Sequence, residues 1–340
     1  MNYKFGICGP FDFEEKQTGG QSVKTREFYY ALCNQIGKEK IYILESTGYK
    51  KNPIKFMYKF FFMLRRCENI VILPAQNGIR VFAPICYFMK GKTKIHYSVI
   101  GGWLPDMLKS NIKLLRYIQK FDTVFVETNS MKVELEILGL NNVKRLYNFK
   151  NLNPVSNIHG TYCPVKLCYF SRVTKQKGIE DAIAAVEQIN RENVKCILDI
   201  YGPIVDGYKT DFEHLISKTS RQIEYKGVIN PTDSIEILKN YDIQLFPTRF
   251  KTEGIPGSIV DSYFAAVPVV AARWNSFADV VDEWKTGIGY KFGDFEDLKR
   301  TLEMLVDDPK IIDSMRINCL EEAKKYYPSN VIKDFFELIK

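Results

Sequence analysis

The sequence predicts an α/β protein with two doubly wound, Rossmann-like domains that face each other across a cleft. Three observations lead to this prediction. The 340 residues are enough for two domains, each with its own core. Short β-branched or aromatic runs alternate with helix-length stretches along the whole chain. A composition of 46% hydrophobic and 26% charged residues is typical of globular proteins and excludes disordered and collagen-like classes.

Residues 1–150 are expected to form the N-terminal domain. The predicted strands are Tyr3–Cys8, Lys40–Leu44, Ile70–Leu73, Ile95–Val99, Thr123–Val126 and Val143–Tyr147. The clearest helical stretches between them are Val23–Ile36, Asn111–Lys120 and Ser130–Leu138. This alternation favours a parallel sheet with helices on both faces.

Residues 151–164 are polar and rich in turn formers, which predicts a linker. A second alternation over 165–327 predicts the C-terminal domain, and the amphipathic tail 328–340 is expected to cross back to the first domain. The predicted strands are Lys166–Phe170, Lys195–Tyr201, Ile223–Tyr225, Ile243–Phe246 and Pro268–Ala271. The predicted helices are Gly178–Asn190, Ser234–Lys239, Gly257–Ala266 and Phe295–Val306.

Several classes of protein are disfavoured. The longest apolar runs are far below the ~18 residues that span a bilayer, and the first ten residues read as a strand rather than a signal peptide. The eight cysteines form no C-x-x-C pair, and no two of the three histidines have metal-ligand spacing. We therefore expect a cytoplasmic protein with reduced thiols and no protein-bound metal.

The two halves of the chain have opposite charge. Residues 1–150 contain 24 lysines and arginines against 12 acids, whereas residues 151–340 contain 24 against 28. The N-terminal half is therefore expected to face a polyanion: an anionic membrane, a diphosphate-bearing substrate or nucleic acid. Nucleic acid is the weaker expectation, because no recognisable binding motif accompanies the charge.

The densest basic segment is 49–66, which holds six cations and no acid. Read as a helix after Pro53, its 3.6-residue spacing predicts a core face made of Ile54, Met57, Tyr58, Phe61 and Leu64. Outside that face, Phe56, Phe60, Phe62 and Met63 would lie beside Lys51, Lys55, Lys59 and Arg66. Two interpretations remain open: a helix that lies on an anionic membrane, or a core helix with a solvated basic face.

Three loops contain residues suited to an anionic ligand. Gly19 and Gly20 precede the first helix, where the backbone can approach a ligand, although such a pair is often only a turn. Arg172 and Lys177 lie in the loop after the first strand of the second domain, placed to bind a diphosphate or simply to face solvent.

The third loop is the segment 252–261. Glu253 comes before two glycines and the helix-starting Pro256, and Asp261 follows two turns along the helix. Carboxylates among glycines suit the binding of sugar hydroxyls. A carboxylate that only serves the helix dipole is the alternative, but it does not explain the neighbouring glycines.

With these motifs in view, the chain resembles the retaining GT-B glycosyltransferases that share an E-x7-E motif, the family 4-like glycosyl transferases group 1. The resemblance covers nearly the whole length, and 246–272 is its most specific part. The segments that carry it are Gly19-Gly20-Gln21, Asn148-Phe149-Lys150, Ser171–Gly178, Tyr201-Gly202-Pro203, Gly227-Val228, Glu253–Asp261 and Ala266–Ala271.

The resemblance implies a role for each matching position. Arg172 and Lys177 would neutralise the diphosphate of a nucleotide-sugar donor as its bond to the sugar breaks, and Glu253 would hold hydroxyls of the sugar. The implied donor-binding residues are Gly19, Gly20, Gly202, Val228, Gly254, Ile255, Pro256, Gly257, Ser258, Ile259 and Asp261, with Asp261 on the ribose hydroxyls. No cofactor or metal is implied, and a UDP-sugar is favoured over a GDP-sugar.

Two positions depart from the family pattern. The second carboxylate is Asp261, one methylene shorter than the usual glutamate, so a ribose contact would need a small helix shift or a water. Ile100 stands where a histidine is frequent, and His96 is expected to pack inside its strand. The acceptor-side candidates then become Gly102, Trp103 and Asp106, unless that loop is only a structural turn.

The resemblance and the basic half together predict a retaining hexosyltransferase that acts on a glycan carried by a membrane lipid diphosphate. Surface-polysaccharide assembly, such as capsule or O-antigen, and a peripheral position on the inner face of the plasma membrane are the expected context. The alternative is a non-catalytic GT-B subunit that stabilises or directs a partner transferase, which the two departures motivate. A sugar-nucleotide epimerase of the same fold is disfavoured.

Overall fold

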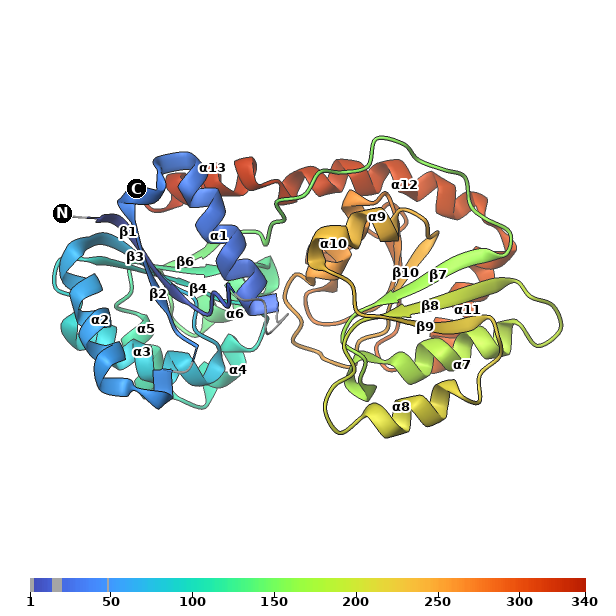
Figure 1. Ribbon diagram of the computed structural model, residues 1–340, viewed down its shortest axis with the longest axis horizontal. Coiled ribbons are helices and arrows are strands. Elements are labelled where there is room, and N and C mark those ends of the chain that lie inside the picture. Colours follow the sequence, from blue (N-terminus) through green and yellow to red (C-terminus); the bar gives the residue numbers. More distant parts are fainter. Residues whose placement is uncertain (1–2, 14–19, 48) are drawn as a thin grey trace. The chain divides into compact units, whose positions relative to one another are not determined.

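The computed structural model describes residues 3–13, 20–47 and 49–340 (Figure 1). The chain divides into two compact units: unit 1 comprises residues 1–151 together with 326–340, and unit 2 comprises residues 152–325. Each unit contains a six-stranded sheet with helices packed on both of its faces. The predicted α/β class is therefore confirmed, and the parallel pairing expected from the alternation is present throughout both sheets.

The sheet of unit 1 has the strand order β2-β1-β3-β4-β5-β6. Its strands are β1 (Tyr3–Gly9), β2 (Ile41–Glu45), β3 (Cys67–Ile72), β4 (Lys94–Ser98), β5 (Thr123–Val126) and β6 (Val143–Arg145). The helices are α1 (Gly20–Ile36), α2 (Pro53–Arg66), α3 (Gln76–Met89), α4 (Leu104–Lys109), α5 (Ile112–Ile118), α6 (Asn129–Ile137) and α13 (Pro328–Leu338), with 3₁₀ turns η1 (Lys38–Lys40) and η2 (Tyr49–Lys51).

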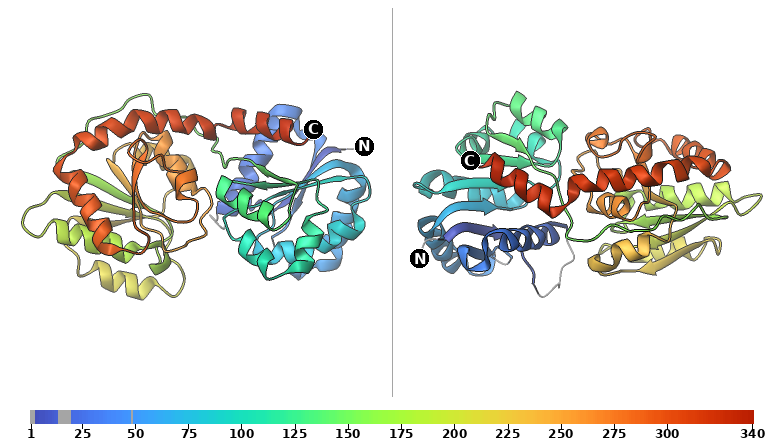
Figure 2. Two further views of the ribbon diagram at one scale, coloured as in Figure 1. Left: turned by 180° about the vertical axis from the view of Figure 1, so that it is seen from behind. Right: turned by 90° about the horizontal axis from the view of Figure 1, so that it is seen from above.

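The C-terminal helix α13 completes the core of unit 1. It lies beside α1, on the face of the sheet opposite α2 and α3 (Figure 2). Phe335 of α13 is fully buried, and its ring centroid lies 5.1 Å from that of Phe28 and 5.4 Å from that of Phe125. An aromatic contact of this kind anchors the end of the chain far more strongly than a surface contact would.

Helix α2 is present where it was predicted, but the predicted core face was wrong except at Leu64. The residues that pack inward are Phe56, Phe60 and Met63, together with Leu64, whereas Ile54, Tyr58 and Phe61 are exposed. The reason lies in the neighbouring helix: the ring of Phe82 in α3 sits 5.7 Å from Phe56 and 5.4 Å from Phe60, centroid to centroid. Because α2 is apolar on more than one side, tertiary packing and not local spacing selected its buried face.

The sheet of unit 2 has the strand order β12-β11-β10-β7-β8-β9. Its strands are β7 (Val165–Phe170), β8 (Cys196–Tyr201), β9 (Ile223–Gly227), β10 (Ile243–Phe246), β11 (Val269–Ala272) and β12 (Gly287–Tyr290). The helices are α7 (Ile179–Ile189), α8 (Lys209–Ile216), α9 (Ser234–Leu238), α10 (Gly257–Phe264), α11 (Phe295–Asp307) and α12 (Lys310–Ala323), with 3₁₀ turns η3 (Lys175–Lys177), η4 (Pro231–Asp233), η5 (Phe277–Asp279) and η6 (Lys324–Tyr326).

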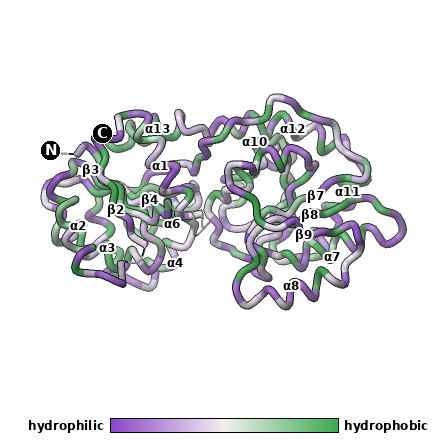
Figure 3. Tube along the Cα trace, viewed as in Figure 1, coloured by the Kyte–Doolittle hydropathy of each residue, from purple (hydrophilic) through white to green (hydrophobic). Residues whose placement is uncertain are grey.

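In each sheet the order of strands along the chain reverses at one place. In unit 1 the reversal falls between β1 and β3, and in unit 2 it falls between β7 and β10. Hydrophobic segments run along the strands of both sheets (Figure 3). The polar loops at the carboxyl ends of such strands form a crevice, which is where doubly wound proteins bind ligands.

The segment 152–164 is bound to unit 2 rather than free in solvent. The backbone N–H of Val155 donates to the carbonyl of Phe264 at 2.9 Å, and both the N–H and the hydroxyl of Thr161 donate to Asp313. The N–H of Tyr162 donates to Asp242, a fully buried carboxylate. The expected linker is thus a strap along unit 2.

All eight cysteines are free thiols, and six of them are buried. Burial raises the pKa of Cys67, Cys86 and Cys196 to about 12, so these thiols stay protonated at neutral pH. None of the helices in the described part of the chain combines the length and the hydropathy that a bilayer crossing needs.

Candidate active site

Two loops of unit 2 meet where the strand order reverses. Strands β7 and β10 are parallel neighbours, paired through Leu167 and Ile243, so their carboxyl ends lie at the same edge of the sheet. The loop after β7 carries Arg172 and Lys177, and the loop after β10 carries Glu253. Residues 76 positions apart in the chain are thereby brought into contact.

Lys177 and Glu253 form an ion pair through Nζ and Oε1, with side chains only 10% and 15% exposed. The hydroxyl of Thr248 donates to the same oxygen of Glu253 at 2.8 Å. The ammonium of Lys177 also lies 5.4 Å and 5.2 Å from the ring centroids of Phe246 and Phe250. A cation held between a carboxylate and two aromatic rings, largely shielded from water, exerts a stronger field than one at the surface.

The buried phenol of Tyr169 fixes both ends of the β7 loop. Its hydroxyl lies 2.9 Å from the carbonyl oxygen of Arg172 and 3.4 Å from that of Lys177. Burial raises the pKa of Tyr169, so the hydroxyl remains protonated and can donate to these carbonyls. The backbone at both candidate cations is therefore anchored from within the sheet.

Two glycines allow the loops to touch through their backbones. Gly178 has φ = 73°, and a Cβ there would lie 1.8 Å from the carbonyl oxygen of Pro247. Gly202 has φ = 135°, and a Cβ there would lie 1.9 Å from the carbonyl oxygen of Ser171. Any other residue at either position would push the strand-end loops apart, so Gly202 has a packing role in addition to the donor contact predicted for it.

Arg172 differs from Lys177 in being exposed and in forming no ion pair within residues 3–13, 20–47 and 49–340. Lys175, in the same loop, lies 3.5 Å from the carboxylate of Glu180. The loop thus carries one guanidinium without a carboxylate partner among the described residues, five positions before Lys177. A guanidinium in this position can bind a phosphate through two parallel hydrogen bonds.

The segment after Glu253 leads directly into helix α10. Pro256 is extended (φ −66°, ψ 124°), and the helix begins at Gly257. The helix itself supplies no acceptor for the N–H groups of its first residues, Gly257 and Ser258, which makes them suitable donors to an anion. Ile255 and Ile259 are buried, and Gly254 has no side chain, so these positions can offer only backbone groups to a ligand.

Asp261 is less accessible than the other predicted carboxylate. It is only 3% exposed, on the side of α10 that packs into unit 2. The structure brings Lys177 and Glu253 into contact and ties the backbone of Arg172 to that of Lys177 through Tyr169, but it does not expose Asp261 to solvent. A ribose contact by Asp261 therefore requires movement of α10 or a bridging water.

Val228 lies at the same edge of the sheet, directly after β9. It is exposed, and its neighbour Gly227 accepts a hydrogen bond from the N–H of Gly202 at 2.9 Å. The loops after β8 and β9 are therefore joined to each other. This arrangement leaves backbone and one apolar side chain for contact with a flat ligand.

The acceptor-side candidates lie in unit 1, in the loop after β4 and in α4. The indole N–H of Trp103 donates to the carbonyl of Ile100 at 2.8 Å, so it is already used inside the loop next to Gly102. Asp106 is exposed and pairs with Lys109 at 3.1 Å. The first residue of α1, Gly20, is exposed, and Gly19 lies outside the described residues.

A buried ion pair in unit 1 has no signal in the local sequence. Lys24 of α1 and Glu127, which follows β5, lie 2.5 Å apart and are both buried. Two charges so far apart in sequence can be matched only through the fold. His96 is confirmed as a packed residue: its Nε2 lies 3.1 Å from Oδ1 of Asn69, and burial lowers its pKa to about 4.

Metal ligation finds no support in the part of the chain that is described. No group of three or more His, Cys, Asp or Glu residues there is arranged to hold an ion.

The comparison with protein families finds a match over most of unit 2. Residues 163–326 match the family described as Glycosyl transferases group 1. Glycogen synthase of Mycobacterium tuberculosis is 24% identical over 152 residues, which cover 43% of this chain and 35% of that protein. The capsular polysaccharide biosynthesis glycosyltransferase CapM of Staphylococcus aureus is 22% identical over 169 residues, 50% of this chain and 44% of that protein. The chain thus spans less than half the length of these curated relatives.

Solved structures match the whole chain. HepE of Anabaena, solved with UDP and glucose, has a TM-score of 0.77 at 14% identity and is covered, like this chain, to 99%. Sucrose-phosphate synthase of Thermosynechococcus elongatus has a TM-score of 0.76 at 13% identity, with 99% of this chain and 98% of that chain covered. Identities this low establish the fold alone, and they confirm the predicted GT-B architecture.

Proposed function

Because unit 2 matches the group 1 glycosyl transferase family and the chain has a GT-B fold, we propose that the protein transfers a sugar from a nucleotide-diphosphate donor to an acceptor glycan. The observation that carries the proposal is the Lys177–Glu253 pair at the strand reversal of unit 2, with Arg172 in the same loop as Lys177. Two cations and a carboxylate at such a crevice match the needs of a diphosphate joined to a sugar.

The donor would rearrange this pair. Its diphosphate would attract the ammonium of Lys177 and the guanidinium of Arg172, and Glu253 would then accept hydrogen bonds from hydroxyls of the donor sugar. The hydroxyl of Thr248, which already donates to Glu253 at 2.8 Å, would keep that carboxylate in place. In the absence of a donor, Lys177 and Glu253 thus neutralise each other's charge.

We propose that transfer proceeds with retention of configuration. The bond between the anomeric carbon and the phosphate oxygen breaks, and the acceptor oxygen bonds to the same face of that carbon. The acceptor proton passes to an oxygen of the leaving diphosphate. Arg172 and Lys177 stabilise the negative charge that grows on the leaving group, so the scheme needs no metal, and a hexose is the expected sugar.

A uridine nucleotide is the favoured donor base. HepE, which shares the fold over its whole length, has been solved with UDP and with UDP-glucose. In this chain the base would lie near Gly227 and Val228, where backbone and an exposed apolar side chain are available. The ribose would approach Asp261.

For the acceptor we propose a glycan linked to a lipid diphosphate at an anionic membrane, as in capsule or O-antigen-like surface polysaccharide assembly. The support comes from one helical layer of unit 1. Helices α2, α3 and α5 contain no acidic residue, and they pack together through ring contacts such as Phe60 with Phe82 and Tyr87 with Tyr117, the latter at 5.0 Å. A layer with cations and no acids suits an anionic surface.

The exposed side of α2 combines apolar and basic side chains. Ile54 is 84% exposed and Tyr58 is 73% exposed, on a helix that also carries Lys55 and Lys59. The guanidinium of Arg65 lies 4.9 Å from the ring of Phe61, and a similar contact joins Arg66 and Phe62. This combination is typical of helices that lie in a membrane interface, and it favours the membrane interpretation of 49–66 over a merely solvated face.

Vesicle binding tests the membrane part of the proposal. The triple variant Lys51→Glu, Lys55→Glu and Lys59→Glu should bind phosphatidylglycerol-containing vesicles about a hundredfold more weakly, since each cation near the surface contributes about 1 kcal/mol. Neither the variant nor the wild type should bind pure phosphatidylcholine. Reversal of three exposed cations of unit 2, Arg191, Lys218 and Lys310, is the matched control. Equal binding by both triple variants would refute the membrane proposal.

Thermal unfolding with a panel of nucleotides and nucleotide sugars tests the donor site. A ligand at ~100 times its Kd should stabilise the protein by about 2.7 kcal/mol. Arg172→Ala should remove that shift, whereas Lys175→Ala, a neighbouring exposed cation, should leave it intact. A thermal shift that persists in Arg172→Ala would show that the diphosphate does not bind at this loop.

A non-catalytic GT-B subunit that stabilises or directs a partner transferase is the second candidate. The burial of Asp261 and the isoleucine at position 100 favour it. The Lys177–Glu253 pair counts against it, because a subunit without chemistry has no need of a matched cation and carboxylate. Absence of any shift across the nucleotide panel would support this second candidate.

A further inference from the structure

A cavity of about 260 Å³ lies along the edge strand β12 of unit 2, apart from the donor loops. Its wall is made chiefly by Arg273, Glu283, Trp284, Asp297 and Arg300. None of these residues belongs to the candidate active site. The proposed donor contacts do not account for an exposed tryptophan at this place.

Trp284 occupies a backbone position that suits glycine. Its φ is 63°, in the left-handed region, where bulky side chains are rare because Cβ crowds the following carbonyl. The side chain is nevertheless 55% exposed, so the unfavourable conformation does not serve to fill the core. A large aromatic ring kept at the surface in a strained conformation points to a role in binding.

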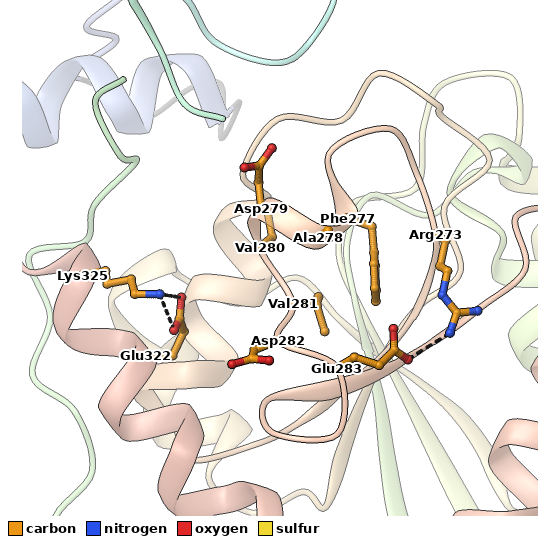
Figure 4. A pocket seen from close by; sticks show the side chains of 10 residues that line it. All are labelled: Arg273, Phe277, Ala278, Asp279, Val280, Val281, Asp282, Glu283, Glu322 and Lys325. Atoms are coloured by element: carbon orange, nitrogen blue, oxygen red, sulfur yellow. Dashed lines mark hydrogen bonds and ion pairs between the residues drawn. The ribbon is translucent and has the colours of Figure 1, made fainter. Parts of the chain in front are cut away.

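The charged side chains of the cavity neutralise one another in fixed pairs. A guanidinium nitrogen of Arg273 lies 3.0 Å from Oε1 of Glu283 (Figure 4), and one of Arg300 lies 3.2 Å from Oδ1 of Asp297. The same Glu283 oxygen accepts from the N–H of Gly289 at 2.8 Å, which restrains the carboxylate. The wall therefore offers planar donors and acceptors in close alternation without a net charge.

Figure 4 shows the other side of the Arg273–Glu283 pair, where a second cavity of about 470 Å³ is lined by Asp279, Asp282 and Glu322. That cavity is acidic and contains no exposed tryptophan, so the two sides of the pair differ in chemistry. The cavity that contains Trp284 has no net charge, and its chemistry is the one that indicates a class of ligand.

We propose that the cavity around Trp284 is a second saccharide-binding site, which holds a neutral glycan chain. The indole face would stack on the apolar face of a sugar ring, as aromatic rings do with flat partners. Arg300 and Asp297 would donate to and accept from neighbouring hydroxyls, which present a donor and an acceptor side by side. The volume fits about one sugar unit, so the rest of the chain would extend over the surface.

One consequence depends on the proposed function. If the protein elongates glycans, a glycan held at β12 keeps its free end at a high effective concentration near the same molecule. Binding itself needs neither donor nor acceptor chemistry, so the site can be tested separately from transfer.

Affinity electrophoresis and fluorescence test the site directly. The probes are maltoheptaose, cellohexaose and mannohexaose, with a heparin hexasaccharide as the charged comparison. Of the three tryptophans, Trp284 is exposed whereas Trp274 is buried and Trp103 is half-buried, so a bound neutral saccharide should change the exposed-type emission of the wild type. Trp284→Gly should weaken that binding roughly tenfold or more.

The matched control is Ile317→Ala, a site on α12 with the same exposed fraction of 55%. This control should bind saccharide like the wild type, and Trp284→Gly should fold because glycine fits the backbone. Equal affinity of Trp284→Gly and the wild type overturns the proposal, and so does binding of the heparin probe alone or of no probe. Failure of the donor proposal looks different: nucleotides would give no thermal shift while saccharide binding persists.

Discussion

Helix α2 of unit 1 and the surface of unit 2 use their cations differently. In unit 2 many surface cations are matched by carboxylates, as in Arg249 with Asp181 at 2.7 Å and Lys195 with Asp307 at 2.7 Å. In unit 1 helix α2 carries only cations, and Arg65 lies against an aromatic ring rather than an acid. Matched surface charges contribute little to stability and leave little field outside the protein. Unmatched cations are the ones available to an external anion.

The same contrast appears inside unit 2 on a smaller scale. Lys175 is paired with Glu180, whereas Arg172 in the same loop has no carboxylate partner among the described residues. Lys177 is paired with Glu253, and we expect a bound donor to separate this pair. Cations with a permanent carboxylate partner thus serve the fold, whereas an unpaired cation, or one whose partner the donor would engage, is available to a ligand.

The largest effect is expected within α2 itself. Phe60→Ala should lower the free energy of unfolding by about 3–5 kcal/mol, because it removes a fully buried ring packed on Phe82. Tyr58→Ala, on the exposed side, should change it by less than about 0.5 kcal/mol. Urea unfolding of both variants measures the difference. Similar losses for the two would mean that the exposed side of α2 is covered, which would end its role as a free basic surface.

The next effect concerns the ion pair of unit 2. Lys177→Ala should slow sugar transfer by about 10²–10³-fold, which corresponds to about 3–4 kcal/mol of lost stabilisation of the leaving diphosphate. Lys177→Arg should recover part of the rate, because it restores the charge with a different shape. The control is Lys195→Ala, which removes a paired surface cation. An unchanged rate constant for Lys177→Ala would show that this cation serves only the fold.

Much of the architecture could be predicted from local pattern. β-branched runs located the strands of unit 1, but β12 was missed because two of its four residues, Gly287 and Gly289, disfavour strands. Helix α12 was also missed. Its buried face includes Arg316, whose guanidinium forms an ion pair with the buried carboxylate of Asp242. A local pattern counts that arginine as a surface residue, since only the fold supplies its partner.

The residues of the candidate active site could likewise be predicted only in part. Arg172, Lys177 and Glu253 could be named because their spacing around strand ends and glycines is a local feature. Thr248 and Tyr169 could not, because their roles depend on contacts across loops: a hydroxyl on Glu253 and a phenol on two carbonyls. Most of the predicted inward face of α2 was wrong for the same physical reason, because helical spacing within α2 carries no information about its partner Phe82 on α3.

Acid should act on unit 1 through His96. Burial lowers the pKa of His96 to about 4 from an ordinary 6.5, so the unfolded chain binds a proton that the folded protein excludes. Stability is therefore lost as the pH falls from about 6.5 toward 4, by up to about 3 kcal/mol. His96→Gln should reduce this loss in urea unfolding at pH 7 and pH 4.5, whereas His214→Gln, at an exposed site, should not. An unchanged pH dependence in His96→Gln would assign acid sensitivity to other groups.

The smallest effect is expected at two exposed aromatic residues, one in each unit. Tyr58 sits in a regular helix, where glycine is about 1 kcal/mol less favourable than alanine, so Tyr58→Gly should be less stable than Tyr58→Ala by about that amount. Trp284 has φ = 63°, where alanine is strained by about 1 kcal/mol and glycine is not, so Trp284→Gly should be more stable than Trp284→Ala. The two glycine–alanine differences should therefore have opposite signs in thermal unfolding. Equal signs would show that the backbone at Trp284 is not strained. One reason to assign that ring to binding rather than to packing would then be lost.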